Sequence, residues 1–580
     1  MKKLTASVLL VVLSSSLAVV NAQKKGSDTI TREGNIGEVV ITGALGIQKK
    51  ADAQTSAIQV ISSEKITEAG NPSAIFSLQG KVSGVSITNT NSSVTGTPKI
   101  QVRGMRSLTG NNNALVVIDN VISSAAALQQ LPPELIESVS MLKGSQAAAL
   151  YGSDGVNGVM LVTTKKGTKG RLKITYNGSV DFESVGLLPN RQRNYGQGWY
   201  GGKINVENGA WGAPFNGPLG GQTVPYGIPL YDVDGDGHID VNINDDTPGP
   251  DDSSSIMSTY GPYGKNNIRD FFTTGTVYQN GVTANIGDEN SYLTMSIDNL
   301  QREFVVKDDK LRRTSAFLKA GTKFGKWTFD AIVNYTRQYT TTTDSDLYQD
   351  LLFSSADIPI TKWKDYPDNG YAWNVYYQNP YWKIKHMRYN TTTNRLNLIG
   401  SVGYKVNKNI DVLYRSNVQY LGSFSNQWND GWSSLLVTDP AAITSSYYQT
   451  NSDQTKYYGD LLVNFKYDLT DDLNLKLNVG HNFQNFSYTN TSGGGTNILI
   501  PGLYQVWNLG SPAVPYGLNN QRGSYNSQAV FGNLDLGYKD YLFLTATARQ
   551  EWNSVLREGH RGYFFPSAGL SFVPTKAFDF

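Results

Sequence analysis

Cysteine is absent from this 580-residue chain, and charged residues and long apolar runs are scarce. Without cysteine the protein can have no thiol catalysis, no disulfide framework and no thiolate metal site. Charged residues make up 17% of the chain at a net charge of +2, which gives no reason to expect a nucleic-acid partner. Beyond the N-terminus no apolar run approaches the ~20 residues of a membrane-spanning helix. These absences exclude a helical membrane protein and a disulfide-bonded scaffold.

Catalytic motifs are also missing. The four histidines stand far apart, and neither a nucleophile arrangement nor a paired-carboxylate motif accompanies them. Two residues separate Gly152 from Gly155 and Gly155 from Gly158, and a strand follows. A dinucleotide-binding loop instead has a first gap of one residue and opens a helix. We therefore predict that the protein is not an enzyme.

The first 22 residues have the features of a signal peptide. Two lysines precede an apolar stretch over residues 4–20, and Val20–Ala22 provides the small residues of a cleavage site. A membrane anchor is the alternative, which the serines at 14–16 disfavour because they interrupt an already short stretch. We expect residues 1–22 to be removed on export.

A polar leader over residues 23–50 contains one β-prone run. The run consists of Glu38, Val39, Val40, Ile41 and Thr42. An isolated run of this kind buries nothing, but it can add a strand to a partner's sheet edge, where main-chain hydrogen bonds supply affinity. The residues leave a second interpretation open, in which the run is the first strand of the next domain.

The chain changes character near residue 170. Residues 51–170 have the mixed pattern of a small α+β domain, which ends in the strand–helix–glycine turn–strand sequence of residues 139–170. From Arg171 onward, apolar and polar residues alternate with a period of two. The first example consists of the apolar residues Leu172, Ile174, Tyr176, Val180 and Phe182. A sheet between lipid and a polar lumen requires this alternation.

The spacing of the later strands predicts a membrane barrel. We expect strands near 171–183, 273–287, 291–299, 313–324, 327–339, 395–405, 408–421, 456–468, 472–488, 526–538, 541–551 and 563–573. Short turns and long loops alternate between them, as in outer-membrane barrels, whereas a soluble sandwich has no reason to keep this order. We predict an antiparallel β-barrel in outer-membrane lipid over residues 171–580, with an α+β domain before it.

Three blocks of the N-terminal part resemble the plug domain of the SusC/RagA family of TonB-dependent outer-membrane transporters. They are LQGKVSGVSI (78–87), IQVRGMRSLTGNNNALVVIDNV (100–121) and VSMLKGSQAAALYGSDGVNGVMLVTTKKG (139–167). The run at 38–43 is similar to the TonB box that precedes this plug. The resemblance implies energy-coupled import of an oligosaccharide or peptide nutrient, with TonB and a SusD-like surface lipoprotein as partners. Asn120 departs from the family pattern, which usually has glycine there.

The strand count predicts an incomplete barrel. Plugged transporters have ~22 strands, about ten more than we expect in this chain. The segments at 538–555 and 564–580 resemble the family's mid-barrel pattern. Because lipid does not tolerate open sheet edges, we expect the chain to be a fragment that lacks the last ten or so strands.

One loop has the spacing of a calcium site. Oxygen ligands at positions 1, 3, 5, 7 and 9 correspond to Asp232, Asp234, Asp236, His238 (through its carbonyl) and Asp240. Position 12, which should be a carboxylate, is Ile243. The residues therefore leave two interpretations open, a structural Ca²⁺ and a solvated acidic turn. No other cofactor is expected.

The long loops are rich in aromatic residues. They are Tyr195, Trp199, Tyr200, Trp211, Trp363, Trp373, Tyr376, Tyr377, Tyr381, Trp382, Trp428 and Trp432. Such rings suit stacking on sugars or gripping peptides, but they also suit packing of the loops on themselves. No single substrate residue can be assigned from the sequence.

Arg103 lies inside the second resembling block. Its burial would be costly unless it were paired, so we predict that it anchors the plug to carboxylates of the barrel wall. The alternative is an arginine that faces solvent.

Two other functions are compatible with the pattern. A TonB-linked siderophore or haem receptor is one, although no histidine pair supports haem. A surface adhesin or structural barrel without transport is the other, and the intact run at 38–42 argues against it.

The calcium interpretation makes a direct prediction. Chelation of Ca²⁺ should expose residues 232–243 to added protease, because carboxylates that have lost their cation repel one another. Limited proteolysis with and without chelator measures this. Equal protection under both conditions would contradict a bound Ca²⁺.

Overall fold

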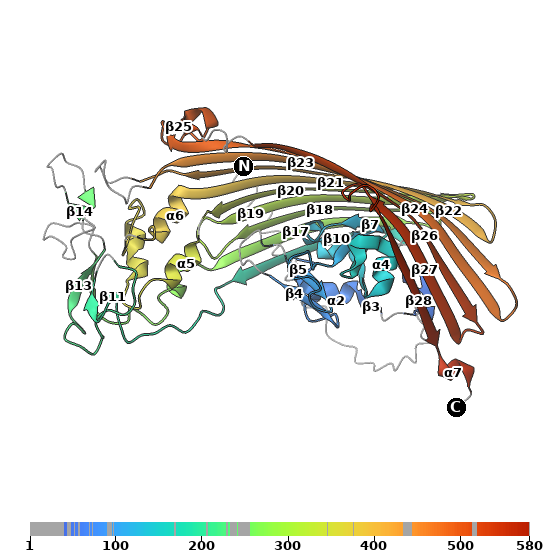
Figure 1. Ribbon diagram of the computed structural model, residues 1–580, viewed down its shortest axis with the longest axis horizontal. Helices are drawn as coiled ribbons and strands as arrows, with labels where there is room; N and C mark the ends of the chain where they lie inside the picture. The colour runs from blue at the N-terminus through green and yellow to red at the C-terminus, as the bar shows by residue number, and fades with distance from the viewer. Residues whose placement is uncertain are drawn as a thin grey trace.

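One large curved sheet dominates the molecule and encloses a smaller domain on its concave side (Figure 1). The computed structural model describes residues 40–578 except 43–47, 51–52, 56–57, 69, 72, 90–95, 97, 168–169, 205–206, 228–229, 232–239, 242–255, 345, 375, 433–442 and 513–518. No helix in these described ranges is long and apolar enough to cross a membrane.

The large sheet is an antiparallel meander of twelve long strands, here called the wall. In order they are β10 (Gly170–Glu183), β17 (Gly275–Gly287), β18 (Ser291–Glu303), β19 (Lys310–Phe324), β20 (Trp327–Thr343), β21 (Met387–Lys405), β22 (Ile410–Asn429), β23 (Ser446–Asp468), β24 (Leu473–Ile498), β26 (Asn519–Tyr538), β27 (Leu542–Asn553) and β28 (Gly562–Phe572). A thirteenth strand, β25 (Leu509–Pro512), pairs with the outer end of β24. The predicted partial β-barrel is confirmed, and each expected strand is present.

Several strands are longer than predicted, always at the end opposite the short turns. β24, with 26 residues, spans roughly 85 Å at ~3.4 Å per residue, whereas a tilted membrane strand needs ~9–11 residues. The added segments, such as residues 446–455 and 489–498, are polar on both faces. They exceed the length that a bilayer requires, and without an apolar face they have no alternation to detect.

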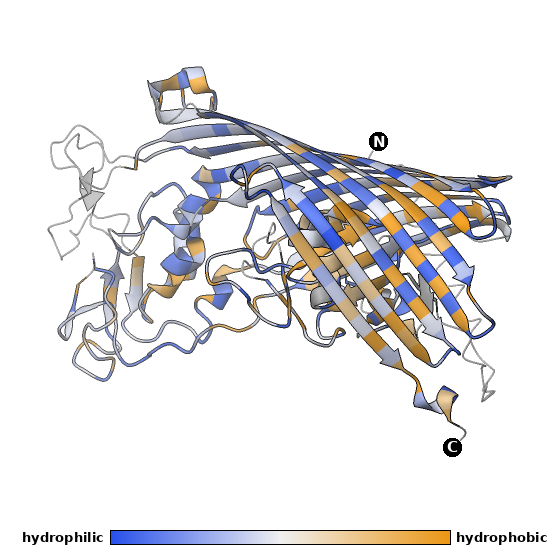
Figure 2. Ribbon diagram, turned by 45° about the vertical axis from the view of Figure 1, so that its right-hand side comes forward, coloured by the Kyte–Doolittle hydropathy of each residue, from blue (hydrophilic) through white to orange (hydrophobic). Residues whose placement is uncertain are grey.

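The two faces of the wall differ as the alternation predicted. On β10 the predicted apolar set is exposed on the convex face, and large exposed apolar residues recur along the other strands (Figure 2). The concave face is polar, and there Thr283 Oγ1 lies 2.9 Å from Ser296 Oγ on the next strand. An apolar outer and polar inner surface is the arrangement that lipid outside and water inside require.

The inner domain, residues 53–164, is built on a five-stranded sheet. Its order is β3 (Gln59–Ser62), β8 (Ile136–Leu142), β9 (Val159–Thr164), β6 (Leu115–Ile118) and β7 (Val121–Ser123). A separate hairpin joins β4 (Val85–Thr88) to β5 (Lys99–Val102). The helices are α2 (Ser63–Thr67), α3 (Ala125–Gln130) and α4 (Ser145–Tyr151). Because β3 pairs only with β8, it is an edge strand of its sheet.

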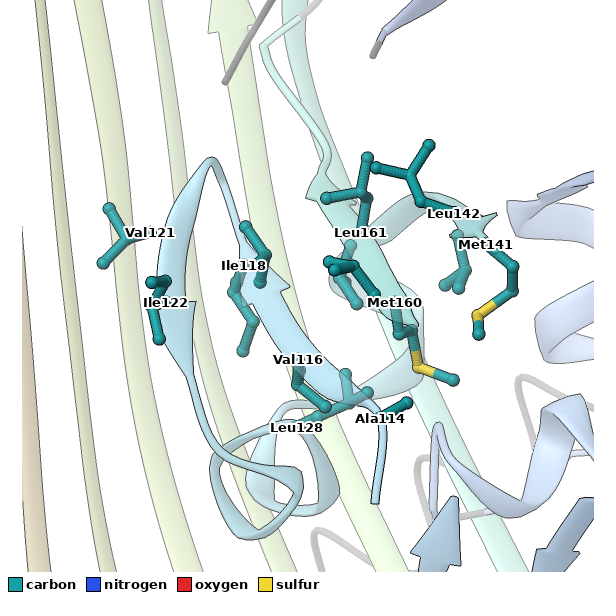
Figure 3. Packing of buried hydrophobic residues seen from close by; sticks show 14 of the residues in the cluster. Ala114, Val116, Ile118, Val121, Ile122, Leu128, Met141, Leu142, Met160 and Leu161 are labelled. Atoms are coloured by element: carbon teal, nitrogen blue, oxygen red, sulfur yellow. The ribbon is translucent and has the colours of Figure 1, made fainter. Parts of the chain in front are cut away.

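Apolar side chains from both sheet faces and the helices make the core of the inner domain (Figure 3). Val116, Met160 and Leu128 are all buried. The same cluster includes six wall residues, Phe317, Ile332, Ile399, Tyr458, Leu462 and Phe531. The inner domain therefore shares its hydrophobic core with the concave face of the wall.

Two long loops form a second folded unit beyond the outer ends of the strands, here called the outer lobe. It comprises the described residues within 184–274 and 344–386, with helices α5 (Leu347–Leu352) and α6 (Pro380–His386). A separate hydrophobic cluster holds it together, with Tyr226, Ile358 and Trp363 buried at its centre. Figure 1 shows the lobe on the concave side, at the opposite end from the short turns.

Candidate functional site

The inner domain meets the wall through a two-residue hairpin turn between β6 and β7. Asp119 and Asn120 have φ values of 47° and 66°, as a type I′ turn requires at both central positions. Asparagine and aspartate enter this left-handed region more readily than other side-chain-bearing residues. Asn120 can thus replace the glycine usual in the resembling family without changing the turn.

A buried lysine of the wall binds the first residue of this turn. Lys319 Nζ on β19 lies 3.0 Å from Asp119 Oδ1, 2.7 Å from Thr164 Oγ1 and 2.9 Å from the Thr164 carbonyl. Thr164 also donates to Asp119, from its amide at 3.0 Å and its hydroxyl at 2.6 Å. Only 3% of the Lys319 side chain and 8% of the Asp119 side chain are exposed. The ion pair is therefore both desolvated and fully hydrogen-bonded.

A buried arginine binds the second residue of the turn. Arg415 Nη1 on β22 donates to the Asn120 carbonyl at 3.2 Å and to Asp460 Oδ2 at 3.0 Å. Gln419, four residues further on the same face, donates to the Ile122 carbonyl at 2.7 Å. The turn is thus held between two buried cations whose own charges are neutralised.

A second contact joins α4 and the glycine turn after it to β27. Arg549 Nη1 donates to the Leu150 carbonyl at 3.3 Å, and Ser153 Oγ donates to Glu551 Oε1 at 2.6 Å. Arg549 Nε pairs with Glu551 Oε2 at 3.0 Å. A Cβ at Gly152 would lie 1.7 Å from Glu551 Oε2, and its φ is +66°. Only glycine fits against the wall here.

Burial raises the pKa of Asp154, in the same turn, although nearby Lys456 opposes the shift. Gln484 of β24 lies next to this carboxyl group and also opposes the shift. On the other side of the domain, Arg313 donates to the Gln129 carbonyl and Arg395 to Gln130 Oε1, both at 2.9 Å. All of these contacts belong to the second half of the inner domain, residues 119–164.

The anchoring role predicted for Arg103 is not seen. Arg103 is exposed, has a φ of 59°, and its amide donates to the Gly84 carbonyl at 2.9 Å. Within the described ranges it forms no ion pair with a wall carboxylate. Its guanidinium lies beside Gly144 of the inner domain, where a Cβ would come within 3.3 Å of Nη1, and the wall carboxylates Asp460 and Glu551 pair with Arg415 and Arg549. The cations of the interface belong to the wall.

These wall cations were not predicted from the sequence, although one signal was available. Lys319, Arg415 and Arg549 are basic residues at inward positions of wall strands, and Arg313 and Glu551 share a strand face with the first and the last of them. A charge in such a place needs a partner, but Asp119, the partner of Lys319, lies 200 residues away in the chain.

The β-prone run of the leader forms a hairpin. β1 (Val40–Thr42) pairs antiparallel with β2 (Gln48–Lys50), and the pair is a sheet of its own among the described strands. Glu38, Val39 and the predicted signal peptide lie outside the described residues. A two-stranded sheet has two outer edges, so a further strand can add to it.

The predicted calcium loop also lies largely outside the described residues, which include only Asp240 of the five expected ligands. That residue begins β15 (Asp240–Val241), which pairs with β14 (Leu230–Tyr231). No group of three or more metal-ligating side chains occurs among the described residues. The Ca²⁺ site stays a prediction.

The aromatic residues of the loops divide into two groups. Trp363, Trp373 and Trp382 are buried in the outer lobe and pack the loops on themselves. A second group is exposed and consists of Tyr195, Trp199, Tyr200, Trp211 and Tyr376. The buried rings therefore pack the loops on themselves, whereas the exposed rings are available for stacking on sugars or for contact with peptides.

The outer lobe has a buried polar centre. Asp357 is fully buried and accepts from the Gln197 amide at 2.9 Å and from the Tyr226 hydroxyl at 3.1 Å. Lys203 Nζ lies 4.7 Å from the centre of the Tyr226 ring and 2.9 Å from the Pro225 carbonyl. Burial raises the pKa of Asp357 and lowers the pKa of Lys203 to about 8, with Asp357 opposing the latter shift.

Comparison with known proteins gives a consistent result. Residues 50–159 match the TonB-dependent Receptor Plug Domain. TonB-dependent receptor SusC of Bacteroides thetaiotaomicron is 33% identical over 187 residues, 30% of this chain and 18% of that protein. TonB-dependent receptor P26 of Formosa agariphila is 37% identical over 137 residues, 23% of this chain and 14% of that protein. The RagAB peptide importer in its 'open-open' state has a TM-score of 0.68 at 16% identity, covering 92% of this chain and 58% of that one.

The chain is thus similar to SusC/RagA-like TonB-dependent receptors, with a plug domain followed by a partial β-barrel. It aligns with less than a fifth of the length of these sequence relatives. The inner domain is called the plug from here on.

The Lys319–Asp119 pair makes a prediction about plug docking. In Lys319→Met the Asp119 carboxylate stays buried without its cation, which should cost about 3–5 kcal/mol. Proteolysis of the plug across a urea series measures the loss. Lys310→Met removes an exposed lysine of the same strand, 3.9 Å from Glu303, and should cost less than about 1 kcal/mol. Equal urea dependence of the two variants would contradict the anchoring role of Lys319.

The lowered pKa of Lys203 makes a prediction about pH. Unfolded lysine has a pKa of 10.5, whereas folded Lys203 loses its proton near 8, so between these values the unfolded lobe binds more protons. Stability of the outer lobe should therefore rise from pH 8 to 9.5 and be flat between pH 7 and 8. Thermal unfolding followed by tryptophan fluorescence measures this, and Lys203→Met should abolish the rise. A melting temperature that falls over pH 8–9.5 in the unaltered protein would contradict the assignment.

Proposed function

We propose that this protein is a TonB-dependent importer that carries an oligosaccharide or peptide nutrient across the outer membrane. The observation that carries the proposal is a plug docked on the polar, concave face of a lipid-exposed wall by buried, fully paired cations. A structural barrel or adhesin has no need of a separate domain in its lumen. A gated pore does, because the plug closes the path until energy is supplied.

Energy enters through the leader in this proposal. TonB adds a strand to the hairpin of β1 and β2, and main-chain hydrogen bonds provide the grip. Tension then reaches the plug at β3, which is an edge strand held by four register pairs to β8. The cation contacts all lie in residues 119–164. Tension therefore separates the first half of the plug from the wall more easily than the second half.

The outer lobe fits the position of a solute-receiving surface. It lies beyond the outer ends of the strands, on the side of the lumen, and carries the exposed group of aromatic residues defined above. We propose that a SusD-like surface lipoprotein closes over this end and that solute is captured between the two proteins. The loop at 232–240 is proposed to hold a structural Ca²⁺.

Deletion of Glu38–Thr42 tests the coupling step. Uptake of the solute should fall to the level of cells without TonB, because no strand remains for TonB to grip, while solute binding at the cell surface should be unchanged. Radiolabelled uptake and surface retention measure the two quantities. Deletion of residues 31–35, an equal length of the same leader, should leave uptake intact. Normal uptake after loss of 38–42 would refute energy coupling through this run.

A further inference from the structure

Three aromatic rings lie on the concave face of the wall between the plug and the outer lobe. They are Phe486 and Tyr488 of β24 and Tyr525 of β26. Gln484 reaches the plug at Asp154, and residues two and four positions further along a strand share its face. Phe486 stands opposite Tyr525 in the strand register. The rings therefore face the lumen, on the side of the plug contact that leads toward the long loops.

The rings form one continuous surface. The Phe486 ring lies 6.1 Å from the Tyr488 ring and 5.2 Å from the Tyr525 ring, at interplanar angles of 37° and 35°. The Tyr488 ring lies across Gly523, where a Cβ would come within 2.4 Å of Cε1. Glycine at this position leaves room for the ring to lie against the sheet, and Tyr488 remains exposed.

Beyond Phe486, on the side away from the plug, the inward side chains of β23 and β24 next to the rings are neutral. Gln454 stands opposite Tyr488 on β23, and the next inward pair is Ser452 with Asn490. Amide and hydroxyl groups donate and accept hydrogen bonds without selecting for charge.

Basic residues that border the rings are already engaged. Lys456, opposite Phe486, lies next to the plug carboxyl of Asp154 and interacts with its charge. Arg549 is paired with Glu551 and bonded to the plug. In this part of the described wall, the cations that an anionic solute could bind are thus already in contact with the plug. A solute with carboxylate, phosphate or catecholate groups would have to compete with the plug for them.

We propose that Phe486, Tyr488 and Tyr525 form a contact surface for a neutral saccharide on its way through the lumen. Rings that present a flat, electron-rich face suit the weakly polarised C–H face of a sugar ring, and the neighbouring amides and hydroxyls suit its hydroxyl groups. This assignment rests on the proposed import function and narrows its solute from oligosaccharide or peptide to uncharged saccharide. A peptide brings terminal charges that this surface does not match.

Binding to the purified full-length protein tests the assignment. The probes are three neutral hexasaccharides, of β-1,4-linked glucose, mannose and xylose, and one hexapeptide without charged side chains, followed by isothermal titration calorimetry. We expect at least one hexasaccharide to bind. Tyr488→Leu keeps apolar volume but removes the flat ring, and Gly523→Ala displaces the ring without removing it. Each should weaken that binding about tenfold, in the range of one stacked aromatic contact.

Matched controls separate stacking from damage to the wall. Phe483→Leu changes an exposed ring on the other face of β24. Gly532 lies on the same strand as Gly523, and a Cβ added there would have its closest neighbour 3.8 Å away, so Gly532→Ala adds a methyl group without a clash. Both should bind saccharide as the unaltered protein does. The assignment would be overturned if Tyr488→Leu and Gly523→Ala bound saccharide as tightly as the unaltered protein, if only the peptide bound, or if no hexasaccharide bound.

The failure of this assignment can be distinguished from failure of the proposed function. Uptake that is independent of residues 38–42 contradicts energy-coupled import but leaves the ring variants and their binding result intact. Uptake that depends on 38–42, together with ring variants of unchanged affinity, keeps the importer and removes the saccharide surface.

Discussion

The ammonium group of Lys319 has left water, and its desolvation is offset only while Asp119 and Thr164 keep their places around it. Removing one partner of such a pair leaves an uncompensated buried charge, which costs far more than the pair itself contributes to stability. The pair therefore acts less as a source of stability than as a strict positional requirement. It allows one orientation of the β6–β7 turn against the wall, and the rest of the plug follows from that orientation.

The same requirement explains the division of the plug into two halves. The wall cations reach residues between 119 and 164, where backbone carbonyls and the turn carboxylate are available to them. The first half is held to the second by the four-residue pairing of β3 with β8 and by the shared hydrophobic core. In the proposed import function, a plug that opens under tension yet remains attached needs one part that yields before the other. The contacts of the wall cations with residues 119–164 make the second half of the plug the more firmly held of the two halves.

The polar lumen serves two purposes. Beneath the plug contact, buried asparagine and threonine side chains satisfy one another across neighbouring strands, as when Asn478 donates to Asn464 Oδ1 at 2.6 Å and Thr547 donates to Asn533 Oδ1 at 2.8 Å. Above it, the inward side chains of the described strands lie clear of the plug. If the protein imports a solute as proposed, this change from paired cations to neutral groups separates the gate from the path.

Local pattern by itself determined the wall. Alternation along residues such as Leu172–Phe182 reports which face meets lipid, and the order of short and long connections reports the side of the membrane, because both are properties of neighbouring residues. Local pattern did not reveal the outer segments of the long strands, because these segments are polar on both faces. It also did not reveal the interface between plug and wall, where Lys319 binds Asp119, a residue 200 positions earlier. Arg103 illustrates the same limit, since a charged residue in a recognisable motif does not indicate on which side its partners lie. Only the tertiary structure decided these contacts, because the register of twelve strands and the docking of one turn select which distant groups become neighbours.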